Sequence, residues 1–276
     1  MELEYIESLV NEMYTQNNPD SQVPTAVNQL LEWQKNSSVF NIIDYSIEFL
    51  LTRTNQRILF FAATSLRTCV QTRWNEFNDE LVEKLVSFLC EYIINKRLYK
   101  STQSYTFILI CFADIVVLTP DFPIQQIFSC FPIDIQVEIC SYYFEEKTTK
   151  FYAHIINQSY FPVPDEILEY VHNILQETDL SPQWIRLYHN FAMGLEYFQP
   201  LVVYMPKLFE AVKIISLSET LIDHIENVLN KDVFVKDLGE PDEYHFEIAN
   251  LAIELSCNLR AAIQQNPNDE SLPNKL

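Results

Sequence analysis

Glycine is nearly absent from this chain, which contains only Gly194 and Gly239 among its 276 residues. A dinucleotide fingerprint, a phosphate-binding Walker loop and tight two-residue hairpins all need glycine at fixed positions. The scarcity of glycine therefore disfavours most nucleotide-dependent enzymes and hairpin-rich β-proteins. The 13 prolines fall mainly between stretches of helical periodicity, where proline begins or ends a helix. We predict an all-α fold.

The longest helical pattern covers residues 55–74 and has two distinct stripes. One stripe is apolar at spacings of three and four residues, which places it on one face of a helix, toward a core. Its members are Ile58, Phe61, Ala62, Leu66, Cys69 and Val70. The other stripe mixes one aromatic ring with polar groups and a guanidinium, and comprises Gln56, Phe60, Thr64, Arg67 and Gln71. We expect this second stripe to be exposed and to contact another protein.

Similar patterns predict helices along most of the chain. They cover residues 2–15, 24–35, 39–51, 79–96, 102–119, 124–130, 135–146, 164–178, 182–197, 201–216, 218–230 and 244–265. Helix pairs recur roughly every 40 residues, the period of HEAT and armadillo repeats. The pattern predicts a right-handed α-α superhelix of this type, with a globular helical bundle as the alternative. Residues 1–120 and 121–265 would belong to one solenoid, followed by a flexible tail at 266–276.

The chain is strongly acidic, with a net charge of −20. That charge opposes binding to nucleic acid and to anionic lipid, and it favours basic proteins as partners. The alternative is that the acidic face serves solubility alone. The most apolar segment, residues 105–118, is too short for a membrane span and contains Asp114. The acidic N-terminus does not have the order of a signal peptide. We expect an intracellular protein without membrane insertion.

Residues that carry chemistry are scattered rather than clustered. The six cysteines, at positions 69, 90, 111, 130, 140 and 257, contain no C-x-x-C pair, and most lie on apolar stripes as core thiols do. The five histidines, at positions 154, 172, 189, 224 and 245, have no metal-ligand spacing. No nucleophile motif of the G-x-S-x-G type occurs. We expect no metal site, no cofactor and no enzymatic activity.

Several motifs occur in an order that resembles a known family. The segment LLEWQKNSSVFNIIDYSIEFL precedes residues 55–74, in which Phe60 to Ala63 read FFAA and lead to Trp74. This order resembles the N-terminal HEAT repeats of the importin-beta (karyopherin-beta) superfamily of nuclear transport receptors. Phe112 to Asp114, reading FAD, and the tryptophan-bearing residues 182–197 are most similar to the transportin-SR and importin-13 branch. The resemblance is carried mainly by residues 1–120.

The resemblance implies transport rather than catalysis. Members of the superfamily bind the GTPase Ran in its GTP form, carry cargo on their concave surface and contact phenylalanine-glycine nucleoporins. For this chain it implies a receptor fragment or a short relative in the cytoplasm and nucleus, and the net charge of −20 favours basic protein cargo. Such receptors are much longer solenoids, so the alternative is a helical-repeat scaffold for cytosolic proteins that does not bind Ran. The stripe of Gln56, Phe60, Thr64, Arg67 and Gln71 is the Ran surface that we predict. The alternative is that Phe60 only packs against a neighbouring repeat.

Overall fold

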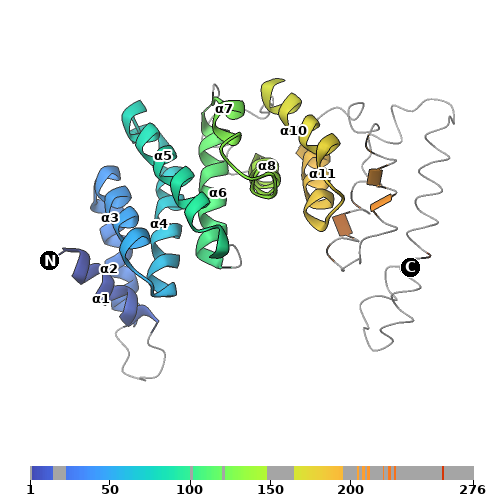
Figure 1. Ribbon diagram of the computed structural model, residues 1–276. Helices are drawn as coiled ribbons and strands as arrows, with labels where there is room; N and C mark the ends of the chain where they lie inside the picture. The colour runs from blue at the N-terminus through green and yellow to red at the C-terminus, as the bar shows by residue number, and fades with distance from the viewer. Residues whose placement is uncertain are drawn as a thin grey trace. The chain divides into compact units, whose positions relative to one another are not determined.

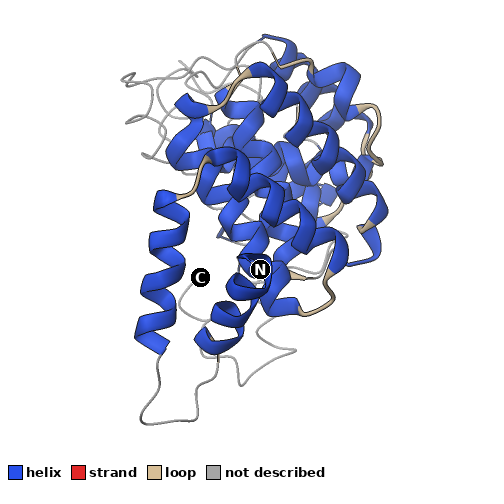
Figure 2. Ribbon diagram, turned by 90° about the vertical axis from the view of Figure 1, so that its left-hand side faces the viewer, coloured by secondary structure: helices blue, strands red, loops and turns tan. Residues whose placement is uncertain are grey.

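The computed structural model describes residues 2–14, 23–99, 102–119, 122–147 and 165–194, together with single positions between 204 and 257. All regular structure in these ranges is helical, and they contain no strand (Figure 2). The all-α prediction is confirmed for this part of the chain. The helices predicted at 201–216, 218–230 and 244–265 and the tail at 266–276 lie outside it, apart from single positions. None of the described helices is both long and apolar enough to span a membrane.

The chain divides into two compact units, Met1–Phe122 and Pro123–Leu276. The described residues of the first unit form six α-helices in sequence, with two short 3-10 segments. These are α1 (Glu2–Met13), α2 (Val23–Asn36), α3 (Val39–Thr52), α4 (Gln56–Arg73), η1 (Trp74–Glu76), α5 (Asp79–Asn95), η2 (Arg97–Tyr99) and α6 (Gln103–Leu118). The bounds of the six α-helices lie within about two residues of the predicted ranges, whereas the two 3-10 segments were not predicted. Neighbours in sequence pack as three pairs, α1 with α2, α3 with α4, and α5 with α6 (Figure 1).

Polar side chains fix where these helices begin. Asn78 Oδ1 accepts a hydrogen bond from the backbone N–H of Leu81 at 2.9 Å, which caps α5. Ser38 caps α3 in the same way through Asn41, at 3.2 Å. A cap of this kind satisfies one of the N–H groups that the first turn of a helix leaves without a partner. The helix starts predicted from polar breaks in the sequence therefore have a local cause.

The core of the first unit lies between the successive helices. All six members of the apolar α4 stripe are at most 7% exposed, so the predicted packing face is confirmed. Trp33 of α2 stacks on Tyr45 of α3 and lies 6.3 Å from the ring of Phe61 of α4. The amide of Gln34 donates to Ser65 Oγ at 2.8 Å. Helices α4 and α6 belong to different pairs, yet the contact between them is the most extensive in the unit.

The second unit contains four helices within the described residues, namely α7 (Ile124–Phe128), α8 (Ile133–Lys147), α10 (Asp165–Glu177) and α11 (Pro182–Gly194). Helix α8 packs on α11, where the rings of Phe144 and Phe191 meet edge to face at 5.0 Å. Trp184 is fully buried, and its indole N–H donates to the carbonyl of Leu175 at 3.0 Å. The tryptophan of the predicted 182–197 helix is thus a core residue of α11.

Candidate partner-binding surface

The polar stripe of α4 is only partly exposed. Gln56 is exposed, whereas Phe60, Thr64, Arg67 and Gln71 are half-buried. The stripe is therefore as exposed as we expect at Gln56 and less exposed than we expect at the other four residues. The reason is that α6 lies alongside α4 and covers much of this face (Figure 1). Whether the stripe binds a partner stays a prediction.

Two members of the stripe contact Phe107 of α6. The rings of Phe60 and Phe107 meet edge to face, with centroids 5.3 Å apart. The guanidinium of Arg67 lies over the same Phe107 ring, 5.7 Å from its centroid. Thr64 instead turns its hydroxyl back to its own helix and donates to the carbonyl of Phe60 at 2.9 Å. These contacts join neighbouring helix pairs and leave little of the Phe60 ring for a second protein.

Arg67 also forms an ion pair with Asp114 of α6. Its Nε donates to Asp114 Oδ2 at 3.1 Å, and the Asp114 side chain is fully buried, whereas that of Arg67 is 20% exposed. A buried carboxylate is costly unless it is paired and hydrogen-bonded. Sequence reasoning used Asp114 as evidence against a membrane span but did not identify its partner. The sequence contains a clue to this pair, because a lone acidic residue such as Asp114 in an otherwise apolar helix requires a cation from a neighbouring element.

Two buried thiols, Cys69 of α4 and Cys111 of α6, are unreactive at neutral pH. Burial raises the pKa of Cys69 to about 11, with smaller opposing effects from Arg73 and Glu76. Burial also raises the pKa of Cys111 well above its usual range, and the nearby Asp114 raises it further. Both groups are neutral thiols at pH 7, and the thiolate is the nucleophile and metal ligand. Among the residues that the structure describes, no group of three or more His, Cys, Asp or Glu could hold a metal ion.

A groove between α2 and α4 remains open. Its volume is about 280 Å³, and it is lined by Leu31, Gln34, Lys35, Ile42, Ser65, Thr68, Cys69, Thr72 and Arg73. Leu31 is 57% exposed, and Thr68 and Thr72 are exposed. An exposed aliphatic side chain beside hydroxyl and amide groups is suited to contact with a protein partner. The sequence prediction missed these residues because it placed the whole partner surface on one stripe of α4.

Arg73 holds one end of this groove. Its Nη1 donates to the carbonyl of Ser37 at 2.8 Å and to that of Gln34 at 3.3 Å, so it satisfies carbonyl groups at the end of α2. The same guanidinium binds both carboxylate oxygens of Glu76, at 2.8 and 2.6 Å. This bidentate hydrogen bond lowers the pKa of Glu76. Arg73 therefore fixes α2 relative to the end of α4.

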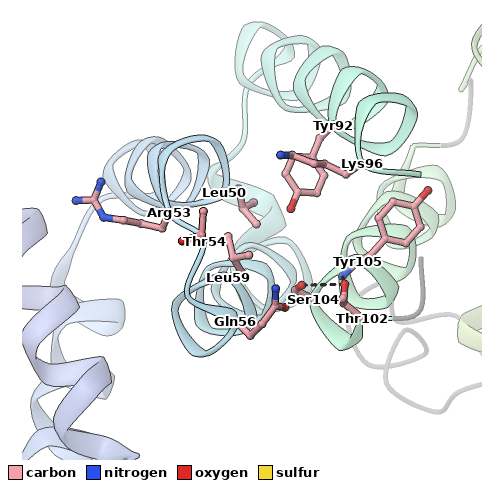
Figure 3. A pocket seen from close by; sticks show the side chains of 10 residues that line it. All are labelled: Leu50, Arg53, Thr54, Gln56, Leu59, Tyr92, Lys96, Thr102, Ser104 and Tyr105. Atoms are coloured by element: carbon pink, nitrogen blue, oxygen red, sulfur yellow. Dashed lines mark hydrogen bonds between the residues drawn. The ribbon is translucent and has the colours of Figure 1, made fainter. Parts of the chain in front are cut away.

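A second cavity lies at the opposite end of α4, where the chain enters the helix. Gln56 is part of its lining, together with residues of α3, α5 and α6 (Figure 3). The five residues of the predicted stripe therefore have three environments: the cavity at Gln56, the α6 interface at Phe60 and Arg67, and half-buried positions at Thr64 and Gln71. No protein-family model and no curated protein sequence matches this chain.

Proposed function

We propose that this chain is a nuclear transport receptor of the importin-beta type, either a fragment or a short relative, that binds Ran in its GTP form. In this proposal it supports transport of basic protein cargo between cytoplasm and nucleus and contacts phenylalanine-glycine nucleoporins. It acts by binding and has no enzymatic role. Its helix pairs continue as a right-handed superhelix.

The observation that carries the proposal is the packing of the motif residues. Trp33 and Gln34, from the aromatic-glutamine motif, contact Phe61 and Ser65 of α4. Phe60 contacts α6, and Ala62 is fully buried. The residues that carry the resemblance are thus those that join α2, α3, α4 and α6 into successive repeats. A sequence order that specifies this stacking supports common architecture with the N-terminal receptor repeats.

The surface offered to Ran combines the accessible part of the α4 stripe with the neighbouring groove. Gln56 and Gln71 supply amide groups, and Leu31, Thr68 and Thr72 add an aliphatic side chain and two hydroxyls. The net charge of −20 supports basic cargo through electrostatic complementarity. Arg67 acts in this arrangement mainly by holding α6, because its Nε is bound to Asp114.

A second candidate is a helical-repeat scaffold that binds cytosolic proteins and never binds Ran. The engagement of Phe60 by Phe107 and of Arg67 by Asp114 favours it. Both residues belong to the predicted Ran stripe, and both are engaged by α6 within the first unit.

Nucleotide-dependent capture separates the two functions. The full chain is immobilised and titrated with Ran carrying a non-hydrolysable GTP analogue or GDP. A transport receptor should bind the GTP form at least about tenfold more tightly, a difference of about 1.4 kcal/mol. Equal affinity for both forms, or no binding, would reject the receptor function and leave the scaffold.

A further inference from the structure

The groove between α2 and α4 differs in charge from the chain as a whole. Its nine lining residues include no aspartate or glutamate, although the chain carries a net charge of −20. Two cations, Lys35 and Arg73, are among the nine. A segment that binds here therefore meets positive charge on a negative protein, and complementary charge in that segment would be acidic.

One of these two cations is available to a partner. Arg73 binds both carboxylate oxygens of Glu76 and donates to two carbonyl groups at the end of α2. Lys35, in the last turn of α2, is exposed and forms no ion pair or hydrogen bond with the residues that the structure describes. Lys35 is thus the positive charge that the groove offers to a second molecule.

Helix geometry aligns the exposed residues along the two walls of the groove. Leu31 and Lys35 are four positions apart on α2, and so are Thr68 and Thr72 on α4, so each pair lies on one face of its helix. All four residues are exposed, and Leu31 is 57% exposed. The lining is completed on its buried side by residues at most 3% exposed, namely Ile42, Ser65 and Cys69.

The α4 wall adds a hydroxyl group that can donate to a partner. Thr72 uses its own hydroxyl to donate to the backbone carbonyl of Thr68 at 2.7 Å. The hydroxyl of Thr68 forms no hydrogen bond with the described part of the chain. The groove therefore combines an ammonium, a hydroxyl donor and an aliphatic side chain. A carboxylate accepts from both donors, and an aliphatic side chain packs on Leu31.

We propose that this groove binds an acidic segment of a protein partner, in which a carboxylate contacts Lys35 and a nearby aliphatic side chain contacts Leu31. In an extended segment, side chains two positions apart share a face and are about 7 Å apart. That spacing is close to the separation of about 6 Å between positions i and i+4 of a helix. The volume of about 280 Å³ suits a few side chains of such a segment rather than a cofactor.

This inference rests on the proposed function, because the groove is part of the surface offered to Ran. It adds the chemistry of the contact, namely that the segment of Ran that enters the groove is acidic. Basic cargo is instead attracted by the negative charge of the chain as a whole.

The first test titrates a fluorescein-labelled peptide with the full chain and follows fluorescence anisotropy. The peptide repeats Glu-Ser-Leu-Ser, so glutamate and leucine are two positions apart. Saturable binding is expected, and Lys35→Glu should weaken it at least about fivefold, because an attraction becomes a repulsion. Arg57→Glu is the matched control, since it changes the net charge equally but lies at the other end of α4, outside the groove. It should leave the affinity nearly unchanged.

The contribution of Leu31 is tested with a second pair of variants. Leu31→Ser should weaken binding of the same peptide about fivefold, because it removes the aliphatic contact. Leu51→Ser is its control, since Leu51 is similarly exposed, at 61%, but lies on α3 outside the groove. A peptide that repeats Lys-Ser-Leu-Ser should bind at least about tenfold more weakly. Equal binding of the two peptides, or equal affinities in Lys35→Glu and Arg57→Glu, would overturn the proposal.

Titration of the same variants with Ran-GTP separates this inference from the proposed function. Weaker binding of Ran-GTP to Lys35→Glu than to Arg57→Glu supports both. Unchanged binding of Ran-GTP in Lys35→Glu would reject the acidic contact and leave the receptor function standing. Binding of the acidic peptide without binding of either form of Ran would reject the receptor function and leave the groove as a site for an acidic segment of another protein.

Discussion

Arg67 of α4 reaches across to Asp114 of α6, where its Nε donates to a carboxylate oxygen at 3.1 Å. The two residues are 47 positions apart, and Asp114 is fully buried among the apolar residues of its helix. The pair therefore joins the second helices of two consecutive pairs. Arg67 therefore has a structural role, although the sequence pattern alone predicts a role in partner binding.

Replacing Arg67 by methionine should lower the free energy of unfolding by about 3–5 kcal/mol, because it leaves a buried carboxylate without its cation. Urea denaturation measures the change. Arg57→Met is the control on the same helix, since Arg57 is exposed, and it should change stability by only about 0.5 kcal/mol. Adding Asp114→Asn to Arg67→Met should restore most of the loss. A loss below about 1 kcal/mol for Arg67→Met would show that the pair contributes little.

Ran binding is better tested with the two glutamines of the stripe than with Arg67 or Phe60, whose replacement disturbs the α6 interface. If the proposed surface is right, Gln56→Ala and Gln71→Ala should each weaken binding of Ran-GTP about fivefold, the effect of one lost hydrogen bond. Neither variant should change the melting temperature appreciably, because both side chains lie outside the core. Calorimetric titration gives the affinities, with Gln29→Ala on exposed α2 surface as the control. Unchanged affinity in both variants would place the contact elsewhere.

The helices of the first unit were predictable because their signals are local. Periodicity placed the apolar face of α4, and polar breaks such as the one at Asn78 placed the helix starts. These features depend on residues within a few positions of one another. Prediction of their existence and limits therefore needed no knowledge of the tertiary fold.

The environment of the α4 stripe was not predictable in the same way. Periodicity shows that Phe60 and Arg67 share a face, but it does not show that α6 packs against that face. Contacts with Phe107 and Asp114 span more than 40 residues and depend on how successive pairs stack. The cavity at the start of α4 was missed for the same reason, since its lining is assembled from four separate helices.

The cap of α5 can be tested directly. Asn78→Ala removes the side-chain oxygen that accepts from the N–H of Leu81 and should destabilise the protein by about 1 kcal/mol. Chemical denaturation measures the loss. Asn75→Ala, at an exposed position three residues earlier, provides the matched control and should have little effect. Equal stabilities of the two variants would argue against the cap.

Buried Cys69 makes stability depend on alkaline pH. Its pKa is raised from 9.0 to about 11 by burial, so between these values the folded state holds a proton that the unfolded state has released. The contribution of Cys69 to the free energy of unfolding is fully present below pH 9 and is lost as the pH rises through about 11. Between pH 8 and pH 10.5, the titration of Cys69 alone should lower the free energy of unfolding by about 2 kcal/mol.

The Cys69→Ala variant removes this group and leaves the other buried thiols and phenols in place; Cys69 is the smallest of the four effects on the pKa of Cys111, which burial raises well above its usual range. Unfolding free energies are measured in urea at pH 8 and pH 10.5 with a phosphine reductant present to prevent oxidation. The unfolding free energy should decrease between the two pH values by about 2 kcal/mol less in Cys69→Ala than in the unmodified chain. Cys130→Ala, which removes an exposed thiol, should keep the drop of the unmodified chain. If Cys69→Ala and Cys130→Ala lose equal stability over this range, Cys69 is accessible to solvent and the packing of α4 against its neighbours is looser than described.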